Sequence, residues 1–164
     1  MEAPSPEWEE RLAGVWGSID DLGEQELLTE IEALAAELGS ESPVAAFERA
    51  SSLDSTGHSD LAVPLYRRAL ELGLSGIRRR RAVIQLSSSL RNLGEAEESV
   101  ALLRAELDQP SDELDDAVRA FLALALVDTG RERQAAGVAL GALAPHLPRY
   151  QRSLANYASD LSGA

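Results

Sequence analysis

The chain has 164 residues, of which 45% are apolar and only 4% aromatic, and its formal net charge is −13. This length suits one compact domain or one short solenoid, and apolar content drawn mainly from Ala and Leu favours helices over a β-sandwich. The absence of cysteine excludes disulfides, thiolate chemistry and Cys-based zinc sites, and the acidic balance disfavours nucleic-acid binding.

The charge is concentrated near the N-terminus. Residues 1–41 contain twelve acidic residues and one arginine, a net charge of −11, whereas residues 42–164 carry −2. The first ten residues are acidic and polar, which is not the pattern of a signal peptide. No run of about 18 apolar residues occurs, so we expect no membrane span and a cytoplasmic protein.

Hydrophobic periodicity and turn residues predict a series of helices along the chain. Pro64 lies inside one of them, where we expect a kink or a later start. Ser59 is a plausible N-cap of that helix. The last helix should begin near Pro148 and cover the final repeat as a cap. The predicted helices span residues 6–22, 24–38, 44–55, 59–72, 77–93, 95–107, 115–129, 131–143 and 148–161.

Four glycines separate the helices of successive pairs. Gly23, Gly57, Gly94 and Gly130 follow one another at spacings of 34, 37 and 36 residues. Each is predicted to end the first helix of its pair in the left-handed conformation. The sequence therefore predicts a helix–turn–helix unit repeated about every 36 residues.

Small residues recur on both sides of these glycines, where they let paired helices approach closely. Seven residues before the last three glycines stand Ala50, Ser87 and Ala123, and five residues after them stand Ala62, Ser99 and Ala135. A helical hydroxyl such as that of Ser87 can also bond back to the preceding turn.

With Tyr66 and Leu103 nine residues after a glycine, and with Pro43, Pro110 and Pro145 or Pro148 near repeat ends, this pattern resembles the tetratricopeptide repeat. The resemblance is best over residues 44–144, and residues 7–38 form a degenerate further unit. It implies an all-α fold, an α-α superhelix of antiparallel helix pairs with three to four repeats and a C-terminal capping helix. The expected division is an acidic N-terminal helical segment (1–41), the repeats (42–147) and the capping helix with a short tail (148–164).

Catalytic and metal-binding patterns are missing. The two histidines, His58 and His146, read as solvated loop residues, and no phosphate loop, nucleophile elbow or metal-ligand spacing occurs. We therefore expect no enzyme activity, no cofactor and no metal.

The run Arg78–Arg81 is the strongest local charge feature, and three interpretations remain open. It can form a solvated face, pair with the acidic N-terminal segment, or bind an anionic ligand. In the family that the chain resembles, the first helix of each pair lines a concave groove, so the groove-facing positions here would include Arg81 and Arg91, whose guanidinium groups can hold a carboxylate. The candidate groove residues are Phe47, Asp54, Arg78, Arg81, Ile84, Gln85, Ser88, Arg91, Asn92, Leu124 and Asp128.

Three functions follow from these features. The first is a non-catalytic scaffold that binds a peptide or helix of a partner protein in the groove. The second is a self-associating protein, a homodimer, or a chain whose groove is filled by its own or a twin's N-terminal segment. The third is an acidic protein that imitates nucleic acid and occupies a basic surface of another protein.

Overall fold

A computed structural model describes residues 4–163, and within that range the regular elements are nine α-helices and one short 3-10 turn, with no strand. The chain divides into two compact units, one up to Ala82 and one from Val83 onward. The boundary falls inside helix α5 (Gly76–Asn92), which contributes its first turns to unit 1 and the remainder to unit 2.

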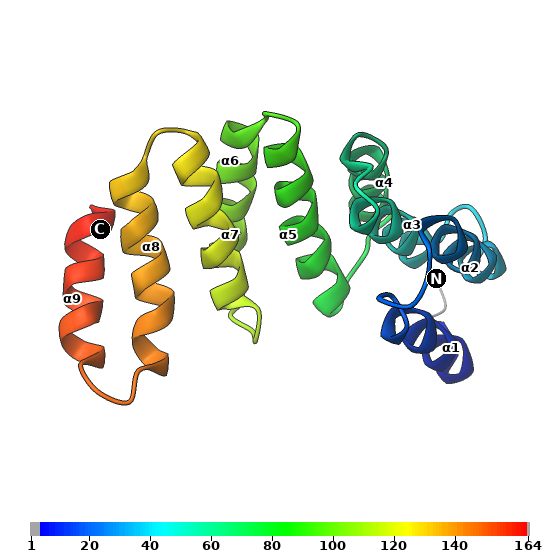
Figure 1. The fold of residues 1–164 in the computed structure, drawn as a ribbon, viewed down its shortest axis with the longest axis horizontal. Helices are drawn as coiled ribbons and strands as arrows, with labels where there is room; N and C mark the ends of the chain where they lie inside the picture. Colours follow the sequence, from blue (N-terminus) through cyan, green and yellow to red (C-terminus); the bar gives the residue numbers. More distant parts are fainter. Residues whose placement is uncertain (1–3, 164) are drawn as a thin grey trace. The chain divides into compact units, whose positions relative to one another are not determined.

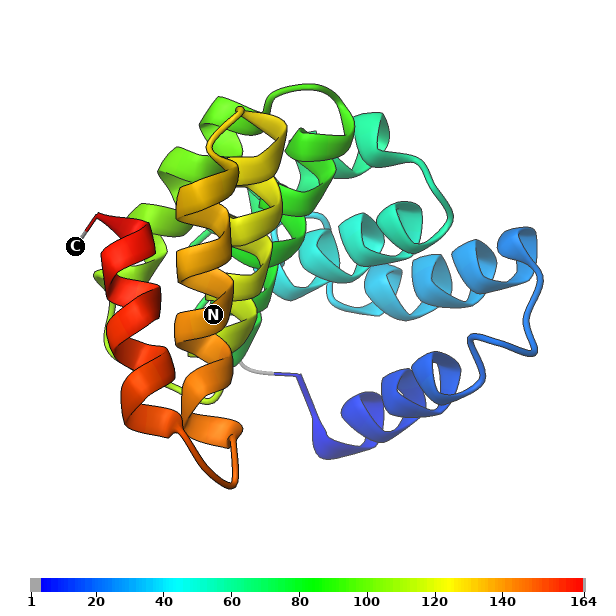
Figure 2. The ribbon, with the colours of Figure 1, turned by 60° about the vertical axis from the view of Figure 1, so that its left-hand side comes forward.

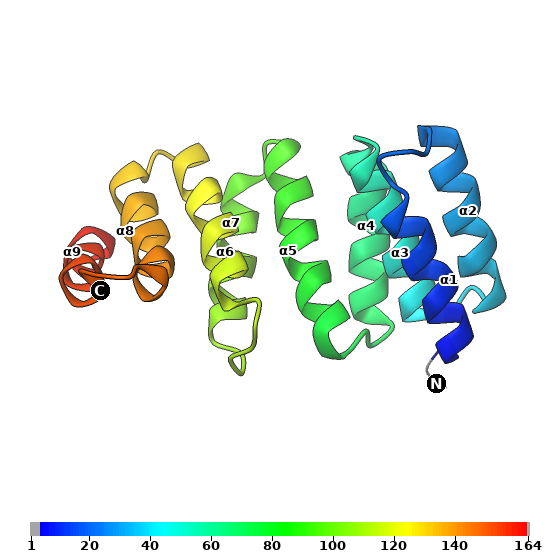
Figure 3. The same cartoon turned by 60° about the horizontal axis from the view of Figure 1, so that its bottom comes forward.

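Unit 1 contains two helix pairs and the start of α5. Helix α1 (Pro6–Gly17) pairs with α2 (Glu24–Glu37), and α3 (Pro43–Ser55) pairs with α4 (Ser59–Glu71). Helices α2, α3 and α4 pack in chain order, each beside the next, as Figures 1 and 3 show. Trp8 and Leu12 of α1 pack with Leu27, Ile31 and Leu34 of α2 in one buried cluster.

Unit 2 contains the remainder of α5 and helices α6 (Ala96–Leu107), α7 (Asp115–Asp128), α8 (Glu132–Leu143) and α9 (Gln151–Ser162). Successive helices run antiparallel and pack against one another, which is clearest for α7, α8 and α9 in Figure 2. A 3-10 turn over Ala144–His146 follows α8. The core of unit 2 is built around Leu103, Val118 and Leu126, which are all fully buried.

The same backbone hydrogen bonds close three of the helix pairs. Gly57, Gly94 and Gly130 have φ angles of 87°, 86° and 73°. The amide after each glycine donates to a carbonyl five residues earlier, for example from Glu95 N to Leu90 O at 2.9 Å. This is the glycine-ended C-cap that the sequence predicted for these three turns.

Gly23 is the exception, and the prediction of a left-handed conformation there was wrong. Gly23 is extended, with φ −72° and ψ 157°, and serves as the N-cap of α2. Helix α1 ends at Gly17, earlier than the predicted Leu22. Glycine and serine at 17 and 18 are weak helix formers, and Asp20 and Asp21 would oppose the negative end of the helix dipole. The first pair is therefore joined by a longer link than the others.

The N-cap of α4 and the start of α9 differ from the sequence prediction. His58, not Ser59, is the N-cap of α4, which starts at Ser59 and contains Pro64, so no later start occurs. Helix α9 begins at Gln151 because Tyr150 adopts the left-handed conformation, with φ 70°. The Gln151 side chain then donates to the carbonyls of Pro145 and Leu147 at 2.9 and 2.8 Å, which closes the turn.

The small residues around the glycines are buried, as close helix packing requires. Ala50, Ala62, Ala123 and Ala135 occupy these positions in two of the pairs. Ser87 and Ser99 occupy them in the remaining pair, and within residues 4–163 neither hydroxyl has a hydrogen-bond partner. The expectation that the Ser87 hydroxyl bonds back to the preceding turn was therefore wrong.

Candidate functional site

The first arginine of the run in α5 is held by carboxylates from two other helices. Arg78 donates from Nη1 and Nη2 to the two carboxylate oxygens of Glu9 in α1, at 2.8 and 2.6 Å. Its Nε donates to Oε1 of Glu48 in α3 at 3.1 Å. For Arg78, the structure thus shows the internal pairing with the acidic N-terminal segment that was one of the three interpretations.

Glu48 is the most buried carboxylate of this network, with only 1% of its surface exposed. Its Oε2 accepts a hydrogen bond from the Trp16 indole Nε1 at 3.0 Å. Burial raises the pKa of Glu48, although the bonds from Trp16 and Arg78 oppose this shift. In contrast, the hydrogen bonds from Arg78 lower the pKa of Glu9, which is more exposed. The two carboxylates around one guanidinium therefore differ in their preference for the charged form.

Arg81 differs from its three neighbours. Arg78 is held by Glu9 and Glu48, and Arg79 and Arg80 each have an interaction partner, whereas Arg81 acts on Glu48 through its charge without a hydrogen bond. The Arg81 guanidinium carbon lies 5.2 Å above the centre of the buried Phe47 ring, a cation–π arrangement. Arg81 is exposed, and within residues 4–163 it makes no hydrogen bond or ion pair. Its planar set of N–H donors is therefore open to a ligand.

Beside Arg81 lies an open pocket of about 460 Å³, which we call the Arg81 pocket. The indole of Trp16 and the network of Glu48 and Arg78 form part of its wall. Its lining comes from α1, α3 and the first turns of α5, all in unit 1, and consists of Glu9, Leu12, Ala13, Trp16, Gly17, Glu48, Arg78 and Arg81.

Two other predicted site residues of unit 1 are built into the α3–α4 pair. Phe47 is fully buried and stacks at a tilt against Tyr66, with ring centres 6.2 Å apart. Asp54 accepts a hydrogen bond from the Tyr66 hydroxyl at 3.5 Å. Burial raises the pKa of Tyr66, and the nearby charge of Asp54 adds to the shift. Phe47 thus supports Arg81 from beneath and offers a ligand little surface of its own.

The remaining predicted site residues lie in unit 2. Ile84 is buried in the core cluster, and Gln85 and Ser88 are half-buried along α5. Arg91 forms an ion pair with Asp128 across α5 and α7, so its guanidinium is already engaged. Leu124 of α7 is 46% exposed, and Asn92 lies exposed at the end of α5. In this unit the predicted positions provide an apolar surface on α7 beside a paired arginine.

The contributions of Glu9, Trp16 and Glu48 were missed from the sequence. Their partners are 30 to 69 residues away, beyond the reach of helical periodicity. One sequence signal could have indicated that Glu48 is buried. Glu48 follows Phe47 directly, on the part of α3 whose helical pattern faces the core. The two histidines are solvated as predicted, with 41% and 64% of their side chains exposed. Each also contacts a carboxylate at 2.8 Å, His58 that of Glu24 and His146 that of Asp116.

A family model described as Tetratrico peptide repeat matches residues 43–161. The chain belongs to the tetratricopeptide repeat family. The matched segment starts at α3, and α1 and α2 lie before it. The predicted fold class is confirmed in that this tetratricopeptide repeat protein is an all-α helical repeat. A search of the curated proteins found no match.

Membership of the family suggests a protein-interaction scaffold, because tetratricopeptide repeats generally mediate contacts between proteins and are generally non-catalytic. In the part of the chain that the structure describes, no helix combines the length and the apolar character needed for a membrane span.

Proposed function

We propose that this tetratricopeptide repeat protein is a non-catalytic scaffold that binds a peptide or helix of a partner protein along its groove-facing helices. The observation that carries the proposal is the guanidinium of Arg81, which is exposed, supported by the Phe47 ring and without a hydrogen bond within residues 4–163. A carboxylate of the partner is the group that such a fork binds best.

The Arg81 pocket supports this assignment through its mixture of surfaces. Trp16 and Leu12 supply apolar area next to the charged group, and aromatic and arginine side chains are typical anchors of protein interfaces. Arg78 is already held by two carboxylates, so it stabilises the wall of the Arg81 pocket and does not bind the ligand itself. In unit 2, the exposed Leu124 and Val127 of α7 provide a further apolar contact surface.

Site-specific photo-crosslinking in cell extract tests the proposal. A photoreactive amino acid at Ala13, which lines the Arg81 pocket, or at Leu124 should capture a defined partner. The same probe at Ala139, an exposed position on α8, is the matched control. Arg81→Gln should remove the adduct at Ala13. Equal capture at Ala139, or an adduct that survives Arg81→Gln, would refute the assignment of the site.

The alternative function is self-association, with the groove filled by the chain's own or a twin's N-terminal segment. The specific support for it is that α1 already supplies Glu9 and Trp16 to Arg78 and Glu48. Sedimentation over a wide concentration range tests the dimer form, and a monomer at every concentration removes it. Deleting residues 1–39 tests the self-filling form, which requires a clear loss of stability.

A further inference from the structure

A second surface of unit 1 has the features of a docking groove, and it is separate from the Arg81 pocket. We propose that the groove between α1 and α2 binds a basic amphipathic segment of a protein partner. The groove has a volume of about 410 Å³ and lies before the segment that matches the family. The proposal does not depend on the function proposed for Arg81.

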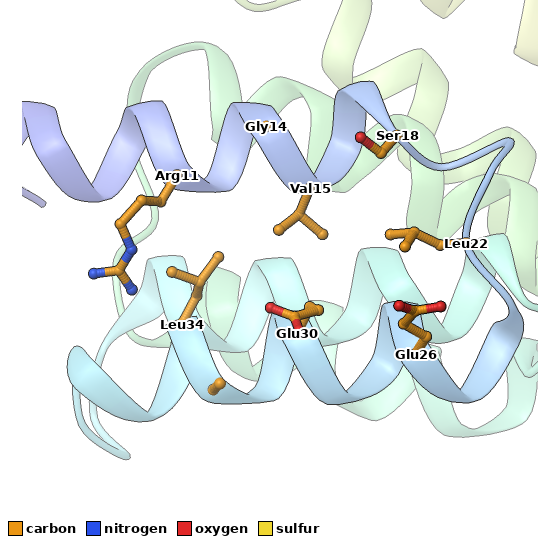
Figure 4. Close-up of a pocket in the computed structure, with 9 residues that line it drawn as sticks. Arg11, Gly14, Val15, Ser18, Leu22, Glu26, Glu30 and Leu34 are labelled. Atoms are coloured by element: carbon orange, nitrogen blue, oxygen red, sulfur yellow. The ribbon is translucent and has the colours of Figure 1, made fainter.

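The floor of this groove is apolar. Val15 of α1, Leu22 of the link and Leu34 of α2 direct their side chains into the space between the two helices, as Figure 4 shows. Val15 and Leu22 are half-buried against the cluster that contains Leu34. An apolar side chain of a partner can therefore be seated between the helices, where it removes more apolar area from water.

The rim on the α2 side carries two carboxylates that no cation in residues 4–163 neutralises. Glu26 and Glu30 are exposed, lie one helical turn apart and line the groove. Neither makes a hydrogen bond or ion pair within residues 4–163. Like charges at this spacing destabilise a helix, and a cation placed between them relieves that repulsion. Arg11 at the other end of the groove is already engaged with Glu37.

The negative charge around the groove also favours a basic partner segment. Residues 1–41 carry a net charge of −11. Besides the rim pair, Glu10, Asp20 and Asp21 have no ion pair within the described residues. This field attracts cationic segments and repels nucleic acid and anionic membrane surfaces. Apolar side chains for the floor together with Lys or Arg for the rim define the partner segment as basic and amphipathic.

A synthetic amphipathic peptide of leucine and lysine, about 18 residues long, serves as the probe for the full-length protein. Fluorescence anisotropy measures its affinity. One comparison peptide carries Glu in place of Lys, and another carries Ser in place of Leu. The test variant Glu26→Gln/Glu30→Gln neutralises the rim. Its control, Glu7→Gln/Glu10→Gln, makes the same change in net charge on α1 outside the groove lining.

A second variant blocks the groove without disturbing its packing. A side chain at Gly14 would meet open space, so Gly14→Arg places a cation in the groove, where the rim carboxylates can hold it. Gln25→Arg adds the same charge at an exposed position on α2 that lies outside the groove lining. Circular dichroism verifies that each variant retains its helices.

The rim variant and Gly14→Arg should each weaken binding of the leucine–lysine peptide by about tenfold, with both controls within about twofold of the parent chain. Neither comparison peptide should bind comparably. The proposal is overturned if the leucine–lysine peptide does not bind, if Glu7→Gln/Glu10→Gln weakens binding as much as the rim variant, or if the serine-containing peptide binds equally well.

Discussion

The indole Nε1 of Trp16 donates a 3.0 Å hydrogen bond to the carboxylate of Glu48, whose other oxygen is held by Arg78. This links α1 to α3 and α5 within unit 1 through one buried carboxylate. The sequence distance between Trp16 and Glu48 is 32 residues, so the bond fixes tertiary structure and not a local turn.

Glu48→Ala should lower the free energy of unfolding by about 2 kcal/mol, because the Trp16 donor loses its buried acceptor and Arg78 loses one of its two partners. Glu32→Ala is the matched control, since it removes the carboxylate of an exposed pair with Arg49 and should cost less than about 1 kcal/mol. Urea unfolding measures both. Similar losses in the two variants would contradict the structural importance of the buried bond.

Glu9→Gln should destabilise the protein near neutral pH by about 0.5 kcal/mol, an amount limited by the partial exposure of Glu9. Arg78 lowers the pKa of Glu9 below its ordinary 4.5, so the stabilisation is fully present above pH 4.5 and is lost as the pH falls through the folded-state pKa. The difference between the parent and the variant should therefore vanish in acid. Glu10→Gln gives the effect of losing one negative charge alone. A difference that persists unchanged in acid would disprove the role of the pair.

Ser87→Ala and Ser99→Ala should each stabilise the protein by about 1 kcal/mol beyond the gain in helix propensity, because each removes a buried hydroxyl that lacks a partner. Ser88→Ala provides the propensity gain alone, since Ser88 is half-buried in the same helix as Ser87. Thermal and urea unfolding measure the three variants. If Ser88→Ala stabilises as much as the other two, the buried hydroxyls carry no extra cost.

Gly137→Ala should loosen α9, because a Cβ at this position would lie 2.6 Å from Ser162 N and 2.7 Å from Ala158 O. Gly141→Ala is the control: its Cβ would lie at an ordinary 3.9 Å from Ala158 Cβ, and replacing a helical glycine should stabilise by up to about 1 kcal/mol. Hydrogen exchange over residues 151–162 reports the attachment of α9. Equal protection in the two variants would show that α8 and α9 adjust without cost.

Much of the fold could be predicted because its signals are local. The turns at Gly57, Gly94 and Gly130 depend on a glycine, a repeating small residue and helical periodicity, all within a few residues of the turn. The prediction for Gly23 was wrong because its position in the repeat matched those of the other glycines while its chain neighbours differed. Tyr150 escaped prediction for a related reason, since a left-handed tyrosine depends on the contacts around it and not on its own preference.

The candidate site was only partly predictable. Arg81 and Arg78 were recognised as a charged run, but their different roles are set by Glu9, Phe47 and Glu48, which the fold brings from other helices. The hydrogen bond from the Trp8 indole to the Leu34 carbonyl could not be predicted either, because every residue has a backbone carbonyl and the residue type does not reveal which one accepts. Pairings across 26 to 69 residues require knowledge of how the helix pairs stack.

The long link between α1 and α2 bears on the order in which the chain acquires its structure. Turns such as the one at Gly94 close between residues that are already neighbours along the chain, so they form early at little entropic cost. Helix α1 has no such turn, and its attachments reach 26 residues to Leu34 and 69 residues to Arg78. Those bonds can form only after α2 and the start of α5 are in place. Helix α1 therefore folds after them, and by the same reasoning it is the first helix to detach when unit 1 opens.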